Sequence, residues 1–276
     1  MKLAAGYIIF DGVDLLEGSI KSVRESVDLI IVSYQTVSWR GKPADPNLLD
    51  SLRSMKKRGL IDEIIEFSEF EPNSGITQSQ INQLKRFELA KRQQCLALAK
   101  SLGATHYLSM DADEFYRKSE FEAAKSLIIK DKLDATAIRY INYITPTLHR
   151  GYARWLVPFI YRITDRCEHS SMQNIFFGVD PTRGIFDPLY RTRRVLDPGL
   201  ISMHHMEMVR RDIKAKYESS SRHFPRIEGL DLLARDIETA QKTGSLRFSG
   251  LHLGDYDDPR ETRKLTQCKN EFGIDF

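Results

Sequence analysis

The sequence predicts an α/β protein in which a half with a mostly parallel central sheet precedes a half of mixed strands and helices. Apolar runs of strand length alternate with amphipathic stretches of helix length through the first half of the chain. These runs are continuously apolar, as in parallel strands covered on both faces. Beyond Asp134 the pattern changes toward antiparallel strands. We therefore divide the chain at this point into residues 1–134 and 135–276, two halves of one compact unit.

The first half opens with a βαβ unit. Residues 3–10 form an apolar strand and residues 11–14 a turn. Leu16, Ile20 and Val23 recur on one face of a helix that we expect over residues 15–26. The other elements predicted in this half are strands at 28–33, 61–67 and 106–110, helices at 47–58 and 81–102, and polar loops at 34–46 and 69–80.

The second half contains shorter elements. We find no internal repeat and no low-complexity segment. The tail after Leu253 is polar. The predicted elements are strands at 135–143, 157–163, 174–179 and 199–205, followed by helices at 210–222 and 231–241.

The composition is that of an ordinary globular protein, with 41% hydrophobic and 29% charged residues among 276. The net charge of +3, from 41 basic and 38 acidic side chains, is too small to indicate a polyanionic partner. We expect no signal peptide and no membrane span, because there is no cleavage site and no long apolar run. Three widely spaced cysteines argue against a disulfide scaffold and a cysteine zinc site, and they favour a cytoplasmic location.

Three acids follow the predicted strand at 106–110, namely Asp111, Asp113 and Glu114. In open α/β sheets, ligands bind at the carboxyl ends of the strands. Clustered carboxylates are costly without a counter-charge, so we expect a cation there. A hard divalent ion such as Mn²⁺ or Mg²⁺ takes oxygen ligands and can hold a diphosphate. The bland alternative is that Asp-x-Asp is a common tripeptide without function.

The context makes the pattern more specific. Residues 91–99, a short loop and residues 106–114 together resemble the helix-strand-DxD passage of family-2 GT-A glycosyltransferases. The opening strand, the turn at Asp11 and residues 17–33 are similar to the opening βαβ unit of that family. This resemblance covers roughly the first 120 residues. It implies a Rossmann-like GT-A fold and metal-dependent transfer of a sugar from a nucleotide-sugar donor, with a UDP-sugar favoured.

The resemblance also implies roles for individual residues. Asp111 would contact the donor ribose or the metal, Asp113 would bind the metal, and Arg92 would approach the nucleotide. The donor site would further include Tyr7, Asp11 and Ala112.

One departure from the family lies after the second strand, where this chain has Ser33, Tyr34 and Gln35 instead of an acidic residue. Tyr34 could stack on the base and Gln35 could hydrogen-bond to it, although Tyr34 could equally be a packing residue.

His204 and His205 end the predicted strand at 199–205. Neighbouring side chains on a strand point to opposite faces, so at most one histidine can enter a shared site. The resemblance implies that one of the two completes the metal shell. The alternative is an ordinary structural histidine.

Basic residues follow in the chain. Arg210 and its basic neighbours through Lys216 could neutralise a diphosphate by charge-assisted hydrogen bonds. A solvated charged face is the alternative interpretation.

An inverting transfer, which the resemblance favours, needs a carboxylate base. Asp180 and Asp187 in turn-like loops are the candidates, with Glu168 as a third, although an aspartate before proline is commonly a turn former.

Several functions stay open at the level of sequence. The acceptor could be a glycan precursor or another hydroxyl compound. It could instead be hydroxylated DNA, as in some phage enzymes, because basic segments at 191–194 and 210–216 have aromatic neighbours. A non-catalytic nucleotide-binding protein of the same fold is a further alternative. A nucleotidyltransferase ranks lowest, because the first strand is followed by no glycine-rich phosphate loop.

Overall fold

The computed structural model describes residues 1–38, 41–68, 78–170, 182–213, 216, 228–246 and 263–275. The elements in the first half are β1 (Leu3–Ile9), α1 (Val13–Arg24), β2 (Leu29–Tyr34), α2 (Leu48–Lys57), β3 (Glu63–Glu66), α3 (Gln78–Ser101), β4 (His106–Met110), β5 (Glu114–Phe115) and α4 (Lys118–Lys130). Those in the second half are β6 (Ala135–Thr145), β7 (Leu148–Arg162), β8 (Glu168–His169), β9 (Ile185–Phe186), β10 (Arg193–Val195), β11 (Met203–His205), α7 (Glu228–Thr243), β12 (Ser245–Leu246), β13 (Arg263–Lys264) and β14 (Thr266–Gln267).

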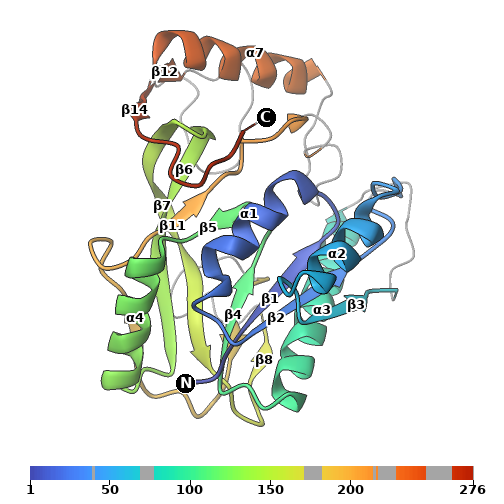
Figure 1. Cartoon of the computed structure of the whole chain (residues 1–276), viewed down its shortest axis with the longest axis vertical. Coiled ribbons are helices and arrows are strands. Elements are labelled where there is room, and N and C mark those ends of the chain that lie inside the picture. The colour runs from blue at the N-terminus through green and yellow to red at the C-terminus, as the bar shows by residue number, and fades with distance from the viewer. Residues whose placement is uncertain are drawn as a thin grey trace.

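One large mixed sheet is the centre of the fold (Figure 1). Its strand order is β3-β2-β1-β4-β7-β6-β11-β5, with β10 and β14 added beside β6 and β7. The first four strands in this order are mutually parallel. From β4 onward the pairing is mixed, since β7 is antiparallel to both β4 and β6. The predicted α/β fold class is therefore confirmed, and both halves of the chain contribute strands to the same sheet.

Side chains of β1 alternate between two apolar cores. Leu3, Ala5, Tyr7 and Ile9 belong to a core that also contains the buried faces of α1, α2 and α4. Ala4 belongs to the other core, which contains the buried side of α3. Covering on both faces explains why the strand is continuously apolar in sequence.

Gly6 lies on the α3 side of β1. A Cβ at this position would lie 1.9 Å from Tyr107 Oη on the neighbouring strand β4. Only glycine leaves room for the tyrosine side chain to cross the strand here.

In the second half, β6 and β7 are antiparallel, as predicted, and β7 starts well before the predicted strand, so that the two form a hairpin. The predicted antiparallel pairing of the strand ending at His205 is found on one side only, because β11 is antiparallel to β5 and parallel to β6. A long connection separates β11 from β7, so its direction is not fixed by a tight turn. The predicted strand at 174–179 and most of the predicted helix at 210–222 lie outside the described residues.

Helix α4 is not among the elements predicted from the sequence. Its buried residues Phe121, Ala124 and Ile128 are three and four positions apart, which is the spacing of one helical face. The signal was therefore present in the sequence. Helix α7 confirms the predicted helix at 231–241.

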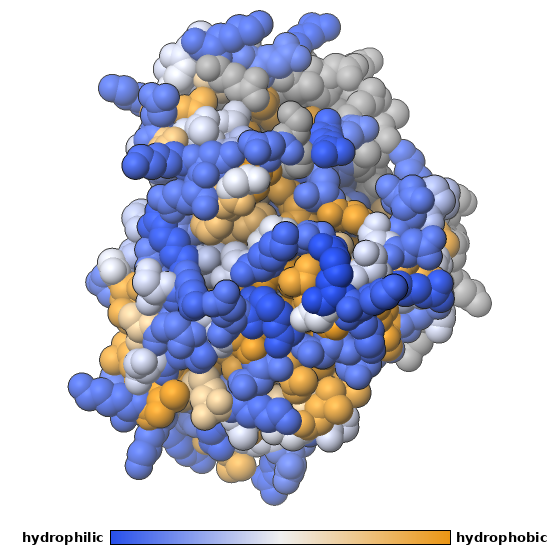
Figure 2. All heavy atoms as spheres, viewed as in Figure 1, coloured by the Kyte–Doolittle hydropathy of each residue, from blue (hydrophilic) through white to orange (hydrophobic). Residues whose placement is uncertain are grey.

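Hydrophilic side chains cover most of the face seen in Figure 2, with apolar residues in small groups between them. All three cysteines are free thiols. Within the described residues, no helix combines the length and apolar character needed to span a bilayer.

Candidate functional site

The carboxyl ends of β1, β2 and β4 meet at one edge of the sheet. Ile9 pairs with Tyr34 of β2, and Tyr7 pairs with Met110 of β4. The residues that follow these strands, including Asp11 and Asp111, are therefore neighbours. Strands β2 and β4 flank β1 on opposite sides, so the strand order reverses here. Such a reversal is where open α/β sheets bind ligands.

Asp111 is held by an arginine from α3. Arg92 is fully buried and donates from Nη1 to Ser109 Oγ at 2.8 Å and from Nη2 to Asp111 Oδ1 at 3.0 Å. The Asp111 side chain itself is 33% exposed, so it can still contact a ligand. Burial raises the pKa of Asp111, but the opposing effect of Arg92 and Arg183 is larger. The resulting pKa lies below the usual value.

The turn after β4 is fixed by a buried ion pair. Arg183 donates from both terminal nitrogens to the carboxylate of Glu114, and Nη2 also donates to the Ser109 carbonyl at 2.8 Å. Glu114 Oε2 accepts a bond from the Asp111 N–H at 3.2 Å. Burial raises the pKa of Glu114 to about 7, against the opposing effect of Arg183. The pair therefore ties both ends of the turn together.

Asp113 is surrounded by cationic and imidazole groups. Its Oδ2 accepts a bond from Arg210 Nη2 at 2.8 Å and another from Lys216 Nζ at 2.8 Å. Its Oδ1 lies 3.7 Å from His205 Nε2. Burial raises the pKa of Asp113, but Lys216, Arg210 and His205 together hold it well below the usual value. The carboxylate is thus ionised in a buried position.

A cavity of about 510 Å³ opens beside these groups. It is lined by the residues that follow β1, by the start of α1 and by the basic segment that begins at Arg210. Burial raises the pKa of Asp11, although Arg210 and Lys216 oppose this shift. The residues that line the cavity are Phe10, Asp11, Gly12, Val13, Asp14, Pro43, Asp45, Arg210, Arg211, Asp212 and Lys216.

Gly12 allows the arginine to reach this cavity. Its φ of 76° lies in the left-handed region, and a Cβ would lie 2.1 Å from Arg210 Nη1. The same Cβ would lie 3.1 Å from Ala112 Cβ, so Ala112 packs beside the arginine rather than facing open space. Glycine is required at this position both by its backbone angle and by the close approach of the guanidinium.

The two histidines have different surroundings, as the alternation of strand side chains predicts. His205 faces the site, where its Nδ1 lies 3.0 Å from Asn142 Oδ1 and its Nε2 points toward Asp113. His204 is buried against Phe272, and its Nδ1 lies 2.8 Å from the Tyr143 hydroxyl. Of the pair, only His205 is placed to act with Asp113.

Three residues predicted to bind the donor are buried with protein partners. Tyr7 has no exposed surface, and its hydroxyl lies 3.2 Å from Ser19 Oγ. Tyr34 donates to Glu66 Oε2 at 3.0 Å. Gln35 donates to the Val37 carbonyl at 2.8 Å and accepts a bond from a lysine of α3. Tyr7 therefore has no surface through which to contact a donor, and the described bonds of Tyr34 and Gln35 are structural.

The two candidate bases differ in what the structure shows. Asp187 is fully buried and accepts bonds from the Thr164 hydroxyl and from the Leu189 N–H at 2.6 Å. These contacts are those of a turn-forming aspartate, the alternative considered for this residue. Asp180 lies outside the described residues and stays a prediction.

The expected divalent ion can be tested against the available ligands. No group of three or more His, Cys, Asp or Glu side chains is arranged to hold a metal ion within the described parts of the chain. Asp111 is paired with Arg92, and Asp113 is paired with Arg210 and Lys216. The described residues therefore do not fit a divalent ion in this conformation.

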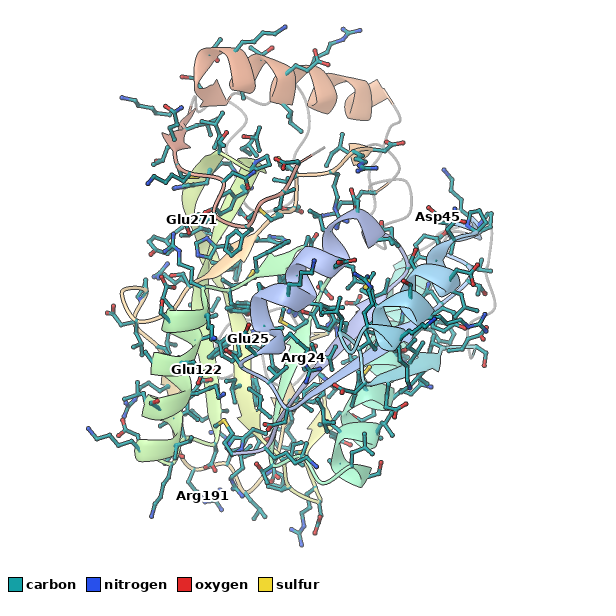
Figure 3. The ribbon with its side chains drawn as sticks, in the orientation of Figure 1. Arg24, Glu25, Asp45, Glu122, Arg191 and Glu271 are labelled. Atoms are coloured by element: carbon teal, nitrogen blue, oxygen red, sulfur yellow. The ribbon has the colours of Figure 1, made fainter. Side chains whose placement is uncertain are left out.

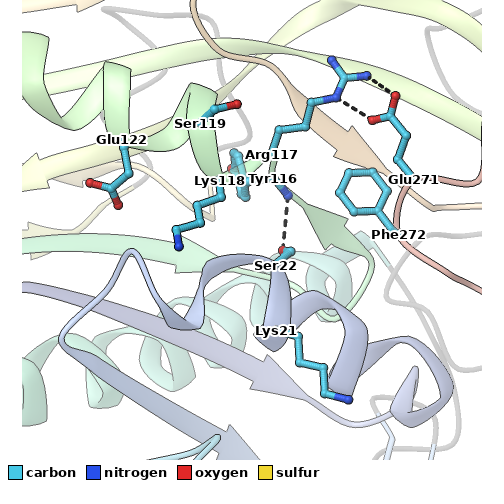
Figure 4. Close-up of a pocket in the computed structure, with 9 residues that line it drawn as sticks. All are labelled: Lys21, Ser22, Tyr116, Arg117, Lys118, Ser119, Glu122, Glu271 and Phe272. Carbon is cyan, nitrogen blue, oxygen red and sulfur yellow. Dashed lines mark hydrogen bonds and ion pairs between the residues drawn. The ribbon is translucent and has the colours of Figure 1, made fainter.

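A larger cavity of about 710 Å³ lies between α1, the start of α4 and the C-terminal segment (Figure 4). Arg117 is already paired there with Glu271, and the shorter of their bonds is 2.6 Å. Neither cavity is lined by Asp111 or Asp113 themselves, but the smaller one is lined by Arg210 and Lys216, the partners of Asp113. We therefore place the candidate site in the smaller cavity, where the strand ends converge.

Sequence reasoning did not identify Lys91 and Arg183 as parts of this region. Lys91 is buried and donates from Nζ to the Ile9 carbonyl at 2.7 Å and to Gln35 Oε1 at 3.0 Å, which joins the ends of β1 and β2. Burial lowers the pKa of Lys91 to about 7. An apolar face of α3 that carries a lysine was the available signal. Arg183 offered no local signal, because its partner Glu114 is far away in sequence.

Comparison with known proteins gives only remote similarity. No protein-family model matches the chain, and no curated protein matches it. Among solved structures, residues 1–349 of S. aureus TarS match with 14% identity and a TM-score of 0.35, covering 51% of this chain and 36% of that one. The UDP complex of the same TarS fragment matches with 14% identity and a TM-score of 0.36, covering 52% of this chain and 36% of that one. Its UDP-GlcNAc complex matches with 12% identity and a TM-score of 0.36, covering 52% of this chain and 35% of that one. The match thus spans about half of this chain and about a third of the 1–349 portion of TarS, and it is too remote to assign an activity.

Proposed function

We propose that this chain is a glycosyltransferase that binds a nucleotide-sugar donor in the cavity at the carboxyl end of β1, beside the partners of Asp113. The observation that carries the proposal is the convergence of Asp111, Asp113 and Arg210 on the point where the strand order reverses. Carboxylates suit the hydroxyl groups of a ribose or sugar, and cations suit a diphosphate. The family-2 resemblance of the first half and the likeness of the fold to TarS agree with this assignment.

The site chemistry accounts for a transfer reaction. An acceptor hydroxyl attacks the anomeric carbon of the sugar, and the bond from that carbon to the diphosphate breaks with its electron pair on the diphosphate. Cations that face the departing oxygen lower the energy of the charge that develops there. The hydroxyl proton passes to a carboxylate base, for which Asp180 stays the prediction.

A glycan or small hydroxyl acceptor is favoured over DNA by the positions of the basic segments. Arg193 pairs with Ala135 at the start of β6, beside the amino ends of β1 and β4. Arg210 lies at the carboxyl ends of the same sheet. Figure 3 shows Arg191 near the lower end of the molecule and the cavity residue Asp45 far from it, at the upper right. The two segments therefore do not form one continuous surface for a duplex.

A panel of nucleotide sugars tests the proposal, with the melting temperature and the release of free nucleotide as readouts. The matching donor raises the melting temperature, because it binds the folded chain and not the unfolded one. It also releases nucleotide slowly by hydrolysis when no acceptor is present. Asp111→Asn should reduce both effects, whereas Asp50→Asn, an exposed aspartate on α2, should leave both unchanged. A panel in which no nucleotide sugar changes the melting temperature would refute the proposal.

A donor that binds and raises the melting temperature without any nucleotide release or transfer would instead support the non-catalytic alternative. Incubation with a mixture of hydroxyl acceptors and labelled donor separates this outcome from a slow hydrolysis reaction.

A further inference from the structure

Two cationic side chains meet at one carboxylate oxygen in the candidate site. Arg210 Nη2 and Lys216 Nζ each lie 2.8 Å from Asp113 Oδ2. All three side chains are largely buried, with exposed fractions of 5% for Arg210, 17% for Lys216 and 8% for Asp113. One carboxylate balances only one of the two positive charges. Both cations also line the cavity, where burial strengthens their attraction for an anionic ligand.

Both cations retain hydrogen-bonding capacity. Lys216 Nζ has three donors, of which one is used by Asp113 and one by the Glu207 carbonyl at 2.9 Å. Arg210 Nε has no hydrogen-bond partner among the residues that the structure describes. The third donor of Lys216, which lines the cavity, can therefore bond to an incoming acceptor.

The start of α1 adds a third source of positive potential. Helix α1 has 12 residues, and no side chain caps its N-terminus. Gly12, Val13 and Asp14 line the same cavity as Arg210, whose guanidinium lies directly against Gly12. The N-terminus of a helix favours anions through its free N–H groups and its dipole. Arg210, Lys216 and the helix start thus converge on a place for an anion.

Four aspartates, Asp11, Asp14, Asp45 and Asp212, also line the cavity. Asp45 Oδ1 accepts a bond from the Asn47 N–H at 2.8 Å. Asp14 accepts bonds from the Arg211 N–H at 3.3 Å and from Arg210 Nη1 at 3.4 Å. Asp11 lies at the end of β1, where a carboxylate can accept bonds from sugar or ribose hydroxyls.

A divalent ion at Asp113 would have to displace Arg210 and Lys216 or lie beside them. The first change breaks two buried charge-assisted bonds, and the second adds repulsion between like charges at close range. No third carboxylate or imidazole completes a metal shell in the described parts of the chain.

We infer that Arg210 and Lys216 bind the diphosphate of the donor directly and supply the positive charge that the Asp-x-Asp pattern had suggested would come from a metal ion. This inference rests on the proposed function. Asp113 then orients the two cations, and the charge that develops on the departing diphosphate is met by side chains rather than by a divalent ion.

Calorimetric titration of the whole chain tests the inference, with inorganic pyrophosphate and UDP as probes. Each is titrated once with EDTA and once with excess MnCl₂. We expect both probes to bind in EDTA, and we expect MnCl₂ not to strengthen their binding. This comparison uses only the wild-type chain, so it does not depend on the folding of any variant.

Substitutions identify the groups that bind. Lys216→Met should weaken binding of pyrophosphate at least about tenfold, the loss typical of a charge-assisted bond. Lys216→Arg should restore most of the affinity, since it keeps the charge. The control Lys56→Met removes an exposed lysine that pairs with Glu63, and it should leave binding unchanged.

Two outcomes distinguish the inference from the proposed function. Binding that requires Mn²⁺ and is unaffected by Lys216→Met overturns the inference and leaves a nucleotide-sugar enzyme in place. Failure of both probes to bind in either buffer overturns the inference together with the proposed function.

Discussion

Replacing Arg183 with methionine tests how the turn at the candidate site is held. The guanidinium makes two bonds to Glu114 and one to the Ser109 carbonyl. Methionine keeps much of the side-chain volume and removes all three bonds. Glu114, whose side chain is 1% exposed, then remains as a buried carboxylate without its cation.

The magnitude follows from this burial. Breaking a buried ion pair by removing one partner costs about 3 to 5 kcal/mol, because the other charge is left uncompensated. For a chain of this size, each kcal/mol lowers the melting temperature by roughly 2 to 4 °C. We therefore expect Arg183→Met to lower the melting temperature by roughly 6 to 20 °C. Adding Glu114→Gln should recover part of the loss, since it removes the unpaired charge.

Urea unfolding at neutral pH, followed by circular dichroism, measures the free energy of unfolding. Arg58→Met is the matched control, because Arg58 also makes two bonds to one carboxylate, that of Glu17, but at the surface. Exposed pairs contribute little, so this control should unfold nearly as the wild type does. If Arg183→Met unfolded like the control, or if Glu114→Gln gave no recovery, the argument from burial would be refuted.

Three further substitutions test the packing around the site. Burial lowers the pKa of Lys91 to about 7, so above pH 7 the unfolded chain binds more protons than the folded one. In urea titrations, the free energy of unfolding of the wild type relative to Lys91→Met should therefore rise by about 2 kcal/mol between pH 7 and pH 9. Equal dependence on pH in both proteins would contradict this. Gly6→Ala should lower the free energy of unfolding by roughly 1 to 3 kcal/mol, because the new methyl group clashes with Tyr107. An unchanged urea midpoint would contradict this. Tyr7→Phe should leave the affinity for a donor unchanged in calorimetry. It should lower the free energy of unfolding by about 1 kcal/mol through the lost contact with Ser19. Weakened donor binding would instead show that Tyr7 contacts the donor.

The parallel half of the fold could be predicted because its signals are local. Continuous apolar runs predicted β1, β2 and β4, and the spacing of Leu16, Ile20 and Val23 predicted α1. The edge at which Asp11 and Asp111 meet followed from the parallel order alone. The direction of β11 could not be derived, because it depends on pairing with β6 across a long connection.

The site was predicted in position but not in its partners. Alternation along β11 correctly required His204 and His205 to face opposite ways, and the contacts of His205 select it as the one near Asp113. The ion pair of Arg183 with Glu114 joins residues far apart in sequence, so no spacing rule could find it. Acids after a strand correctly indicated a nearby positive charge, and the described residues supply that charge from arginine and lysine side chains.

The most direct test of the account is a crystal structure of the chain with its nucleotide-sugar donor. We expect the diphosphate in the cavity at the end of β1, in contact with Arg210 and Lys216 and beside the start of α1. A donor bound elsewhere, such as in the larger cavity beside Arg117, with the ion pairs of Asp111 and Asp113 unchanged, would contradict it.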